Sequence, residues 1–121
     1  MAELLSGFGL EVSAAEAAAL FTGKSTGDAL ALIRQRFGLT LTRADLGRFD
    51  TLLFPRFRAA LRPVPGVAAV LAGLGAPVCV TSNSGHRRLA LSLSLTGLAG
   101  HFGAHVFSAE DVARGKPAPD L

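Results

Sequence analysis

Two short segments in the second half of the chain constrain its fold more than any other feature. The first, residues 77–85, is an apolar run that closes on hydroxyl groups, and the second, residues 115–120, is a proline-rich loop. Lys116 follows Ser82 by 34 positions, a distance that suits a strand, a crossover helix and a second, parallel strand. Such a unit places a hydroxyl and an ammonium at neighbouring strand ends, where both can face one anion.

The first half of the sequence predicts a small helical bundle. Ser13 with Glu16, and Thr42 with Asp45, match the capping-box pattern at the start of a helix. Either Ser25 or Thr26 can cap a further helix. The predicted helices cover residues 2–8, 13–20, 25–37 and 42–61, and Gly9 and Gly38 are the expected stops of the first and third. The apolar positions Leu46, Phe49, Leu53 and Phe57 share one face of the last helix.

Residues 62–66, with the sequence Arg-Pro-Val-Pro-Gly, mark a boundary, because two prolines restrict the backbone and a glycine permits a sharp turn. The pattern beyond it predicts, in order, a helix over 67–74, a buried strand over 78–81, a helix over 85–95 and a short strand over 105–107. This alternation indicates an α/β fold with a parallel sheet. We therefore expect a helical part over residues 1–61 and an α/β part over residues 62–121.

Charge and composition limit the class of partner. The net charge is +3, but the arginines are dispersed and no aromatic residues alternate with them, so we expect no nucleic acid. Prolines, glycines and a polar cluster interrupt the uncharged stretch 63–86, so we expect no membrane span. The single cysteine, Cys79, lies in an apolar run and is expected to be buried and inert. No signal-peptide pattern opens the sequence, which makes a cytoplasmic location the default expectation.

Two polar features could carry chemistry. Ser82, Asn83 and Ser84 follow a predicted strand and precede a helix, where hydroxyls and backbone amides can hold a phosphate. The alternative is that they only cap that helix. Lys116 stands between a glycine and a proline, so that a positive charge is held in a stiff loop. Its alternative is an ordinary exposed lysine. The three histidines have no zinc-site spacing, and we expect no metal site within the chain.

These segments resemble the second and third motifs of the haloacid dehalogenase-like (HAD) superfamily. The likeness rests on Val-Thr-Ser-Asn-Ser at 80–84, Leu-Thr-Gly-Leu at 95–98, Phe-Ser-Ala-Glu-Asp-Val at 107–112 and Gly-Lys-Pro-Ala-Pro-Asp at 115–120. The most similar group carries a helical cap and includes β-phosphoglucomutases, phosphoglycolate phosphatases and sugar-phosphate phosphatases. Pro-Val-Pro-Gly-Val at 63–67 and Phe-Thr-Gly-Lys-Ser at 21–25 are also typical of it. Residues 1–61 would then be the cap, and 62–121 part of the core.

The resemblance implies hydrolysis of a small phosphorylated metabolite, expected to be a sugar phosphate. An aspartate nucleophile forms an aspartyl-phosphate with the help of Mg²⁺. Ser82 and Lys116 would be the catalytic residues of this chain, the serine binding a phosphoryl oxygen and the lysine the same group and the nucleophile. The resemblance implies that the residues contacting phosphate or substrate are Asn83, Lys24, Ser25 and Thr26.

The sequence also departs from the family pattern. It contains neither the Asp-x-Asp-x-Thr motif nor the acidic metal-binding motif. We therefore expect an internal piece of a longer enzyme, with the nucleophile and the Mg²⁺ ligands outside these 121 residues, and no turnover by the chain alone. Two alternatives remain: a phosphomutase, although Thr26 stands where such mutases usually carry arginine, and a non-catalytic binding remnant that self-associates through exposed sheet edges.

Overall fold

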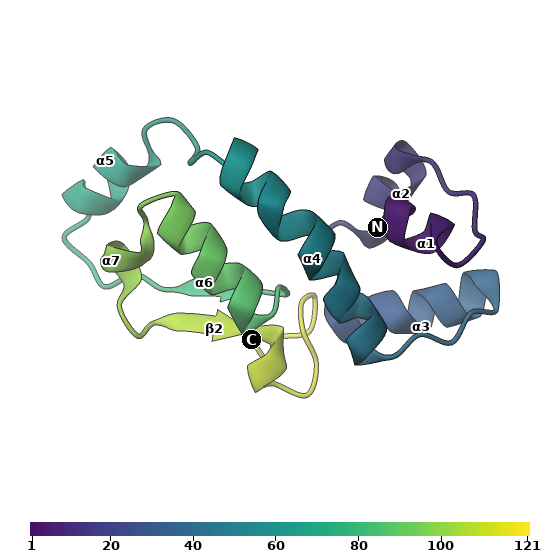
Figure 1. Ribbon diagram of the computed structural model, residues 1–121. Helices are drawn as coiled ribbons and strands as arrows, with labels where there is room; N and C mark the ends of the chain where they lie inside the picture. The colour runs from purple at the N-terminus through teal and green to yellow at the C-terminus, as the bar shows by residue number, and fades with distance from the viewer.

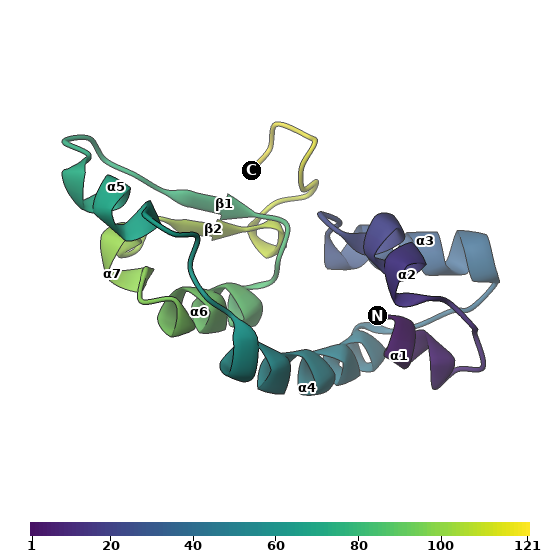
Figure 2. The ribbon, with the colours of Figure 1, turned by 90° about the horizontal axis from the view of Figure 1, so that it is seen from above.

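The computed structural model describes residues 1–121, apart from the side chain of Arg43. Its elements are, in chain order, α1 (Ala2–Ser6), α2 (Ala14–Phe21), α3 (Thr26–Phe37), α4 (Arg43–Ala60), α5 (Val67–Gly73), β1 (Val80–Ser82), α6 (His86–Leu95), α7 (Ala99–Phe102), β2 (Val106–Ser108) and the 3₁₀ turn η1 (Ala109–Asp111). Figures 1 and 2 show α1–α3 at one end of the molecule and the sheet with α5–α7 at the other. The long helix α4 runs between the two groups.

The helix starts follow from local side-chain chemistry. Ser13 and Thr42 form the predicted capping boxes, each accepting the backbone N–H three residues ahead. Ser25 accepts the N–H of Asp28 in the same way, so Ser25, rather than Thr26, caps α3. Gly38 ends α3 with φ of 67°, a left-handed conformation that glycine adopts without strain.

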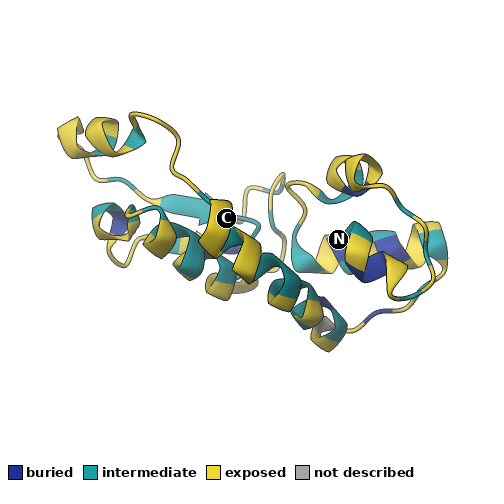
Figure 3. Cartoon of the chain, turned by 45° about the horizontal axis from the view of Figure 1, so that its top comes forward, coloured by how far each residue is buried: buried dark blue, intermediate teal, exposed yellow. Residues whose placement is uncertain are grey.

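The helical bundle has a small core of its own. Leu5 and Ile33 are fully buried, and Leu41 joins them. Half-buried apolar side chains pack around this centre: Met1, Phe8, Leu10, Val12, Phe21, Leu30, Phe37 and Leu39. Figure 3 shows that buried residues gather in this part, whereas α5 is mostly exposed. Helices this short depend on such packing, because isolated helices of fewer than about 12 residues are marginal in water.

The two strands pair in parallel, with Val80 opposite Val106 and Ser82 opposite Ser108. The crossover between them contains the predicted helix, α6, and a second short helix, α7, that the sequence did not predict. Figures 1 and 2 show α6 lying along one face of this sheet. The α/β fold class with a parallel sheet is therefore confirmed, although helices make up most of the chain.

The prediction of a buried first strand and a buried cysteine is wrong. Residues 80–82 are only half-buried, the strand begins two residues later than expected, and Cys79 is exposed. The physical reason is that a two-stranded sheet has little to cover its second face. Val70 and Leu74, which could have shielded it, are themselves 62% and 48% exposed.

The division into residues 1–61 and 62–121 stays a prediction. Within the part of the chain that the structure describes, no helix combines the length and apolar character needed to cross a membrane.

Candidate active site

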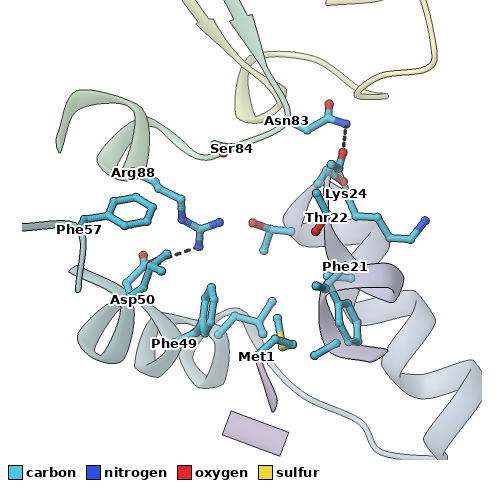
Figure 4. A pocket seen from close by; sticks show the side chains of 18 of the residues that line it. Met1, Phe21, Thr22, Lys24, Phe49, Asp50, Phe57, Asn83, Ser84 and Arg88 are labelled. Carbon is cyan, nitrogen blue, oxygen red and sulfur yellow. Dashed lines mark hydrogen bonds and ion pairs between the residues drawn. The ribbon is translucent and has the colours of Figure 1, made fainter. Parts of the chain in front are cut away.

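A cleft of about 900 Å³ lies between the helical bundle and the sheet end of the molecule. One wall is the apolar face of α4, with Leu46, Phe49, Leu53 and Phe57. The sequence predicted that these four side chains share a face, and the structure turns that face largely into the cleft rather than into the bundle core. Figure 4 shows Phe49 and Phe57 on the wall opposite Thr22. Both apolar and polar side chains therefore line the cleft.

Five of the six predicted site residues line this cleft: Lys24, Ser25, Thr26, Ser82 and Asn83. The sixth, Lys116, borders a neighbouring cavity of about 460 Å³, which Lys24 also lines. In Figure 4 the Lys24 side chain extends away from the centre of the larger cleft. The fold thus brings the 21–26 loop and the end of β1 together, although they are some 60 positions apart in sequence.

Ser82 ends β1 and is half-buried. Its Oγ accepts the backbone N–H of Ser84 at 3.1 Å. A hydroxyl has one proton to donate and two acceptor lone pairs. The bond from Ser84 uses an acceptor position, so the Ser82 proton remains available to a ligand oxygen.

The Lys116 ammonium lies beside the unpaired edge of the sheet. Val80 N–H donates to His105 C=O on the β2 side, and alternation along a parallel strand turns the Thr81 carbonyl to the opposite edge. Lys116 Nζ donates to that carbonyl oxygen at 2.7 Å. An ammonium has three donors, so two N–H groups remain for an anion at this edge. The peptide bond between Lys116 and Pro117 is cis.

The N-terminus of α6 is already occupied by a carboxylate, contrary to the expectation that its first amide helps to hold a phosphate. Glu110 Oε2 accepts the His86 N–H at 2.9 Å. A Cβ at Gly85 would lie 2.7 Å from Glu110 Oε1, so glycine permits this approach. Asp111 Oδ1 pairs with His86 Nε2 at 2.7 Å. The backbone N–H of Ser108, and next the His86 ring, hold the pKa of Asp111 below its ordinary value.

The Ser25 hydroxyl is less available to a ligand than the resemblance implies. Its Oγ accepts the Asp28 N–H at 3.2 Å and donates to Asp28 Oδ2 at 2.7 Å. The hydroxyl proton is therefore engaged in the helix cap. A ligand that uses it must compete with the Asp28 carboxylate.

Apart from Lys24, sequence reasoning missed the charged residues of the cleft: Glu3, Asp50, Arg56, Arg87, Arg88 and Glu110. Arg88 Nη2 donates to Asp50 Oδ1 at 2.8 Å, which joins α6 to α4. Figure 4 shows this guanidinium directed into the cleft. Arg88 also stacks over the Phe49 ring at 5.3 Å. No local pattern distinguishes these arginines from those of a solvated helix face, so only the fold reveals them.

The described residues do not fit a metal centre by themselves. Among them, no group of three or more His, Cys, Asp or Glu side chains is placed to bind a metal ion. We therefore derive no catalytic step through Mg²⁺ from these residues.

Several proteins resemble this chain over nearly its whole length. The 6-phosphogluconate phosphatase of Escherichia coli (strain K12) is 26% identical over 115 residues, which cover 94% of this chain and 52% of that protein. A conserved haloacid dehalogenase-like protein of unknown function from Agrobacterium tumefaciens str. C58 has a crystal structure with a TM-score of 0.65. It is 30% identical, and the likeness covers 98% of this chain and 55% of that one.

A second crystal structure, of a HAD family hydrolase from Deinococcus radiodurans R1 with bound phosphate and sodium, is 33% identical with a TM-score of 0.54. The likeness covers 99% of this chain and 54% of that one. The chain thus spans about half the length of the relatives it matches. No family model matches it.

The parallel strands, with polar loops at their carboxyl ends, define an α/β protein of the kind that binds ligands at that edge of the sheet. The likeness in sequence and fold to these proteins goes further: over nearly its whole length the chain resembles proteins of the haloacid dehalogenase-like superfamily. The resemblance to this superfamily, which the sequence motifs predicted, is confirmed.

Proposed function

We propose that this chain provides the phosphate-binding half of a HAD-type phosphatase, which hydrolyses a small phosphorylated metabolite. The single observation that carries the proposal is the place of the Lys116 ammonium. It lies at the unpaired edge of β1, one residue before the Ser82 hydroxyl, with two donors unused. A cation and a hydroxyl donor at one strand end form a pair that can stabilise a phosphoryl group as its charge develops.

The roles of the two residues follow from their remaining hydrogen-bond capacity. Ser82 donates its proton to a phosphoryl oxygen, while the Ser84 N–H holds its oxygen in place. Lys116 supplies positive charge to the same phosphoryl group and to the attacking carboxylate, which the family mechanism requires. The 121-residue sequence has no Asp-x-Asp pair, and the nucleophile and the Mg²⁺ ligands are proposed to lie outside it.

The proposed substrate class is a phosphorylated sugar or sugar acid. The name of the Escherichia coli relative supports this class. The phosphate bound in the Deinococcus radiodurans structure supports only the phosphoryl part of it. Lys24, Ser25 and Thr26, in the loop facing the end of β1, are proposed to contact the part of the substrate beyond its phosphate.

The test is to express the whole reading frame that contains these residues and to measure phosphate release from a panel of sugar phosphates and phosphorylated sugar acids with Mg²⁺. We expect Ser82→Ala and Lys116→Met each to lower kcat by about 10²–10³-fold, the effect of removing one preorganised donor. Arg58→Met and Ser94→Ala, at exposed helix positions, are the matched controls and should leave kcat unchanged. A Lys116→Met enzyme within about threefold of wild type would refute the assignment.

The chain of 121 residues on its own is expected to release no phosphate. Magnesium-dependent turnover by this chain alone would show that the nucleophile lies within it, and the proposed division of the site would be wrong.

A phosphomutase is the alternative within the same family. Thr26, in place of the arginine usual in such mutases, favours hydrolysis. Conversion of one sugar phosphate to its isomer, without net phosphate release, would identify the mutase.

We propose self-association as the non-catalytic alternative, because the two-stranded sheet has free edges and carries an exposed apolar side chain. Phe107 is 43% exposed on β2. An oligomer in light scattering, which Phe107→Ser converts to a monomer, would support it.

A further inference from the structure

One side-chain amide joins three segments that are far apart in the sequence. Asn83 Nδ2 donates to the Gly23 carbonyl at 2.7 Å and to the Lys116 carbonyl at 2.9 Å. Its Oδ1 accepts the Lys116 backbone N–H at 2.7 Å. Both backbone polar groups of Lys116 are therefore held by one amide, which also reaches the loop of the helical bundle. Figure 4 shows the Asn83 side chain turned toward this loop.

The backbone around Lys116 is shaped to receive this amide. A Cβ at Gly115 would lie 2.5 Å from Asn83 Oδ1 and 3.1 Å from the Ala109 Cβ. Real Cβ atoms do not approach an oxygen so closely, so residue 115 must be glycine while Asn83 keeps its place. Two donors and an acceptor at the end of a short side chain are found together only in asparagine, and Asn83 is the single asparagine of the sequence.

We propose that Asn83 is a positioning residue, which sets Lys116 at the sheet edge and ties its placement to the loop at residues 22–25. Two hydrogen bonds hold the Lys116 backbone, and from there its side chain reaches the Thr81 carbonyl at 2.7 Å. The third bond crosses to Gly23. A displacement of the helical bundle from the sheet would break this third bond and leave the first two. The hydrogen bonding of the Asn83 amide therefore depends on the position of the loop at residues 22–25.

This role differs from direct contact with the substrate. Both N–H donors of the Asn83 side chain are engaged by the protein, and one acceptor lone pair is left. A phosphate offers only acceptors at its ionised oxygens, so this side chain has no free donor for it. Asn83 therefore acts through Lys116. The functional meaning of that placement rests on the proposed phosphatase function.

The first arm of the test measures amide hydrogen exchange by NMR in the 121-residue chain. In Asn83→Ala, the Lys116 N–H loses its acceptor, and its exchange should accelerate roughly fivefold or more. In Asn83→Asp the acceptor oxygen remains, so the Lys116 N–H stays protected, while the amide signals of Gly23 and Lys24 shift because the donor to Gly23 is lost. Gly115→Ala, which displaces the amide sterically, should reproduce Asn83→Ala. Gln35→Ala removes another side-chain amide, beside the smaller cavity that Lys116 borders, and is the matched control.

The second arm is a double-mutant cycle with inorganic phosphate as the probe. Asn83→Ala and Lys116→Met should each weaken phosphate binding, and Asn83→Ala should add nothing in the Lys116→Met background. Equal weakening by Asn83→Ala in both backgrounds would overturn the proposal, because Asn83 would then touch the phosphate itself. Unchanged Lys116 exchange in Asn83→Ala would overturn it as well. If the wild-type chain binds no phosphate, the proposed function fails at this probe, and the exchange arm still decides the role of Asn83.

Discussion

Replacement of Ser108 by alanine tests how the two strand ends are held together. Ser108 is fully buried at the end of β2. Its Oγ donates to the Ser84 carbonyl at 2.8 Å and accepts the Glu110 N–H at 3.0 Å. The bond to Ser84 crosses to the loop that follows Ser82 at the end of β1. This one hydroxyl therefore links the two strand ends of the candidate site.

The expected cost can be worked from these two bonds. The Ser84 carbonyl belongs to a half-buried residue, and leaving it without its partner costs about 1–2 kcal/mol. Glu110 is an exposed residue, so we expect its N–H to bind water instead, at a cost of about 0.5 kcal/mol. The Ser108 backbone N–H keeps its bond to Asp111 Oδ2 at 2.8 Å. We therefore expect Ser108→Ala to lower the free energy of unfolding by about 2 kcal/mol.

Urea unfolding followed by circular dichroism measures this change. With an m-value of about 1.5 kcal/mol per molar, the midpoint should fall by about 1.3 M. Ser94→Ala is the control, because Ser94 is an exposed serine within α6, and it should shift the midpoint by less than about 0.3 M. A Ser108→Ala midpoint equal to that of Ser94→Ala would refute the reasoning, since the buried hydroxyl would then contribute nothing.

Two further predictions concern α4. The Thr42 hydroxyl, and next its backbone N–H, hold the pKa of Asp45 below its ordinary value of 3.8; this stabilisation is present above that value and is lost as the pH falls through the lowered pKa. Thr42→Ala should therefore lower the free energy of unfolding at neutral pH, and the difference from wild type should shrink as the pH falls through the lowered pKa of Asp45 in urea unfolding. Asp50→Ala removes the carboxylate that pairs with the Arg88 guanidinium. The Nε of Arg88 is already buried and unpaired among the described residues. We therefore expect Asp50→Ala to lower the free energy of unfolding by about 2 kcal/mol.

Control variants separate these two effects from nonspecific destabilisation of the fold. Ser13→Ala in α2 removes a capping box without touching α4, so the Asp45 titration should be unaffected. If Thr42→Ala were as strongly destabilised relative to wild type at acid pH as at neutral pH, Thr42 would not be what lowers the pKa of Asp45. Adding Arg88→Met to Asp50→Ala should recover part of the lost stability, and an Asp50→Ala chain as stable as wild type would show that the ion pair contributes nothing.

The local elements of this fold could be predicted because each depends on residues three or four positions apart. Ser13 and Thr42 mark helix starts because a hydroxyl and the N–H of the third helical residue meet wherever the chain turns into a helix. The parallel strand pair followed from the length of the crossover between them. The serine and lysine loops were expected at neighbouring strand ends, and the structure has Lys116 bonded to the residue before Ser82.

Contacts between distant segments could not be predicted in this way. Glu110 reaches the His86 amide over 24 positions, Arg88 reaches Asp50 over 38, and Asn83 reaches Gly23 over 60. Each depends on how elements pack, and charged or amide side chains have the same appearance in a sequence whether they face water or a cleft. The exposure of Cys79 is a case of the same kind, because the burial of a strand depends on what covers the sheet.

The sequence by itself therefore determined the helix caps, the parallel strand pair, the strand end that carries Ser82 and the loop that carries Lys116, since short-range hydrogen bonding and chain length govern them. Only the tertiary structure decided that the apolar face of α4 lines a cleft, that Glu110 occupies the start of α6, and that one asparagine amide holds the Lys116 backbone. The physical reason is that these features are contacts between separate elements, whose free energy exists only once the elements have packed together.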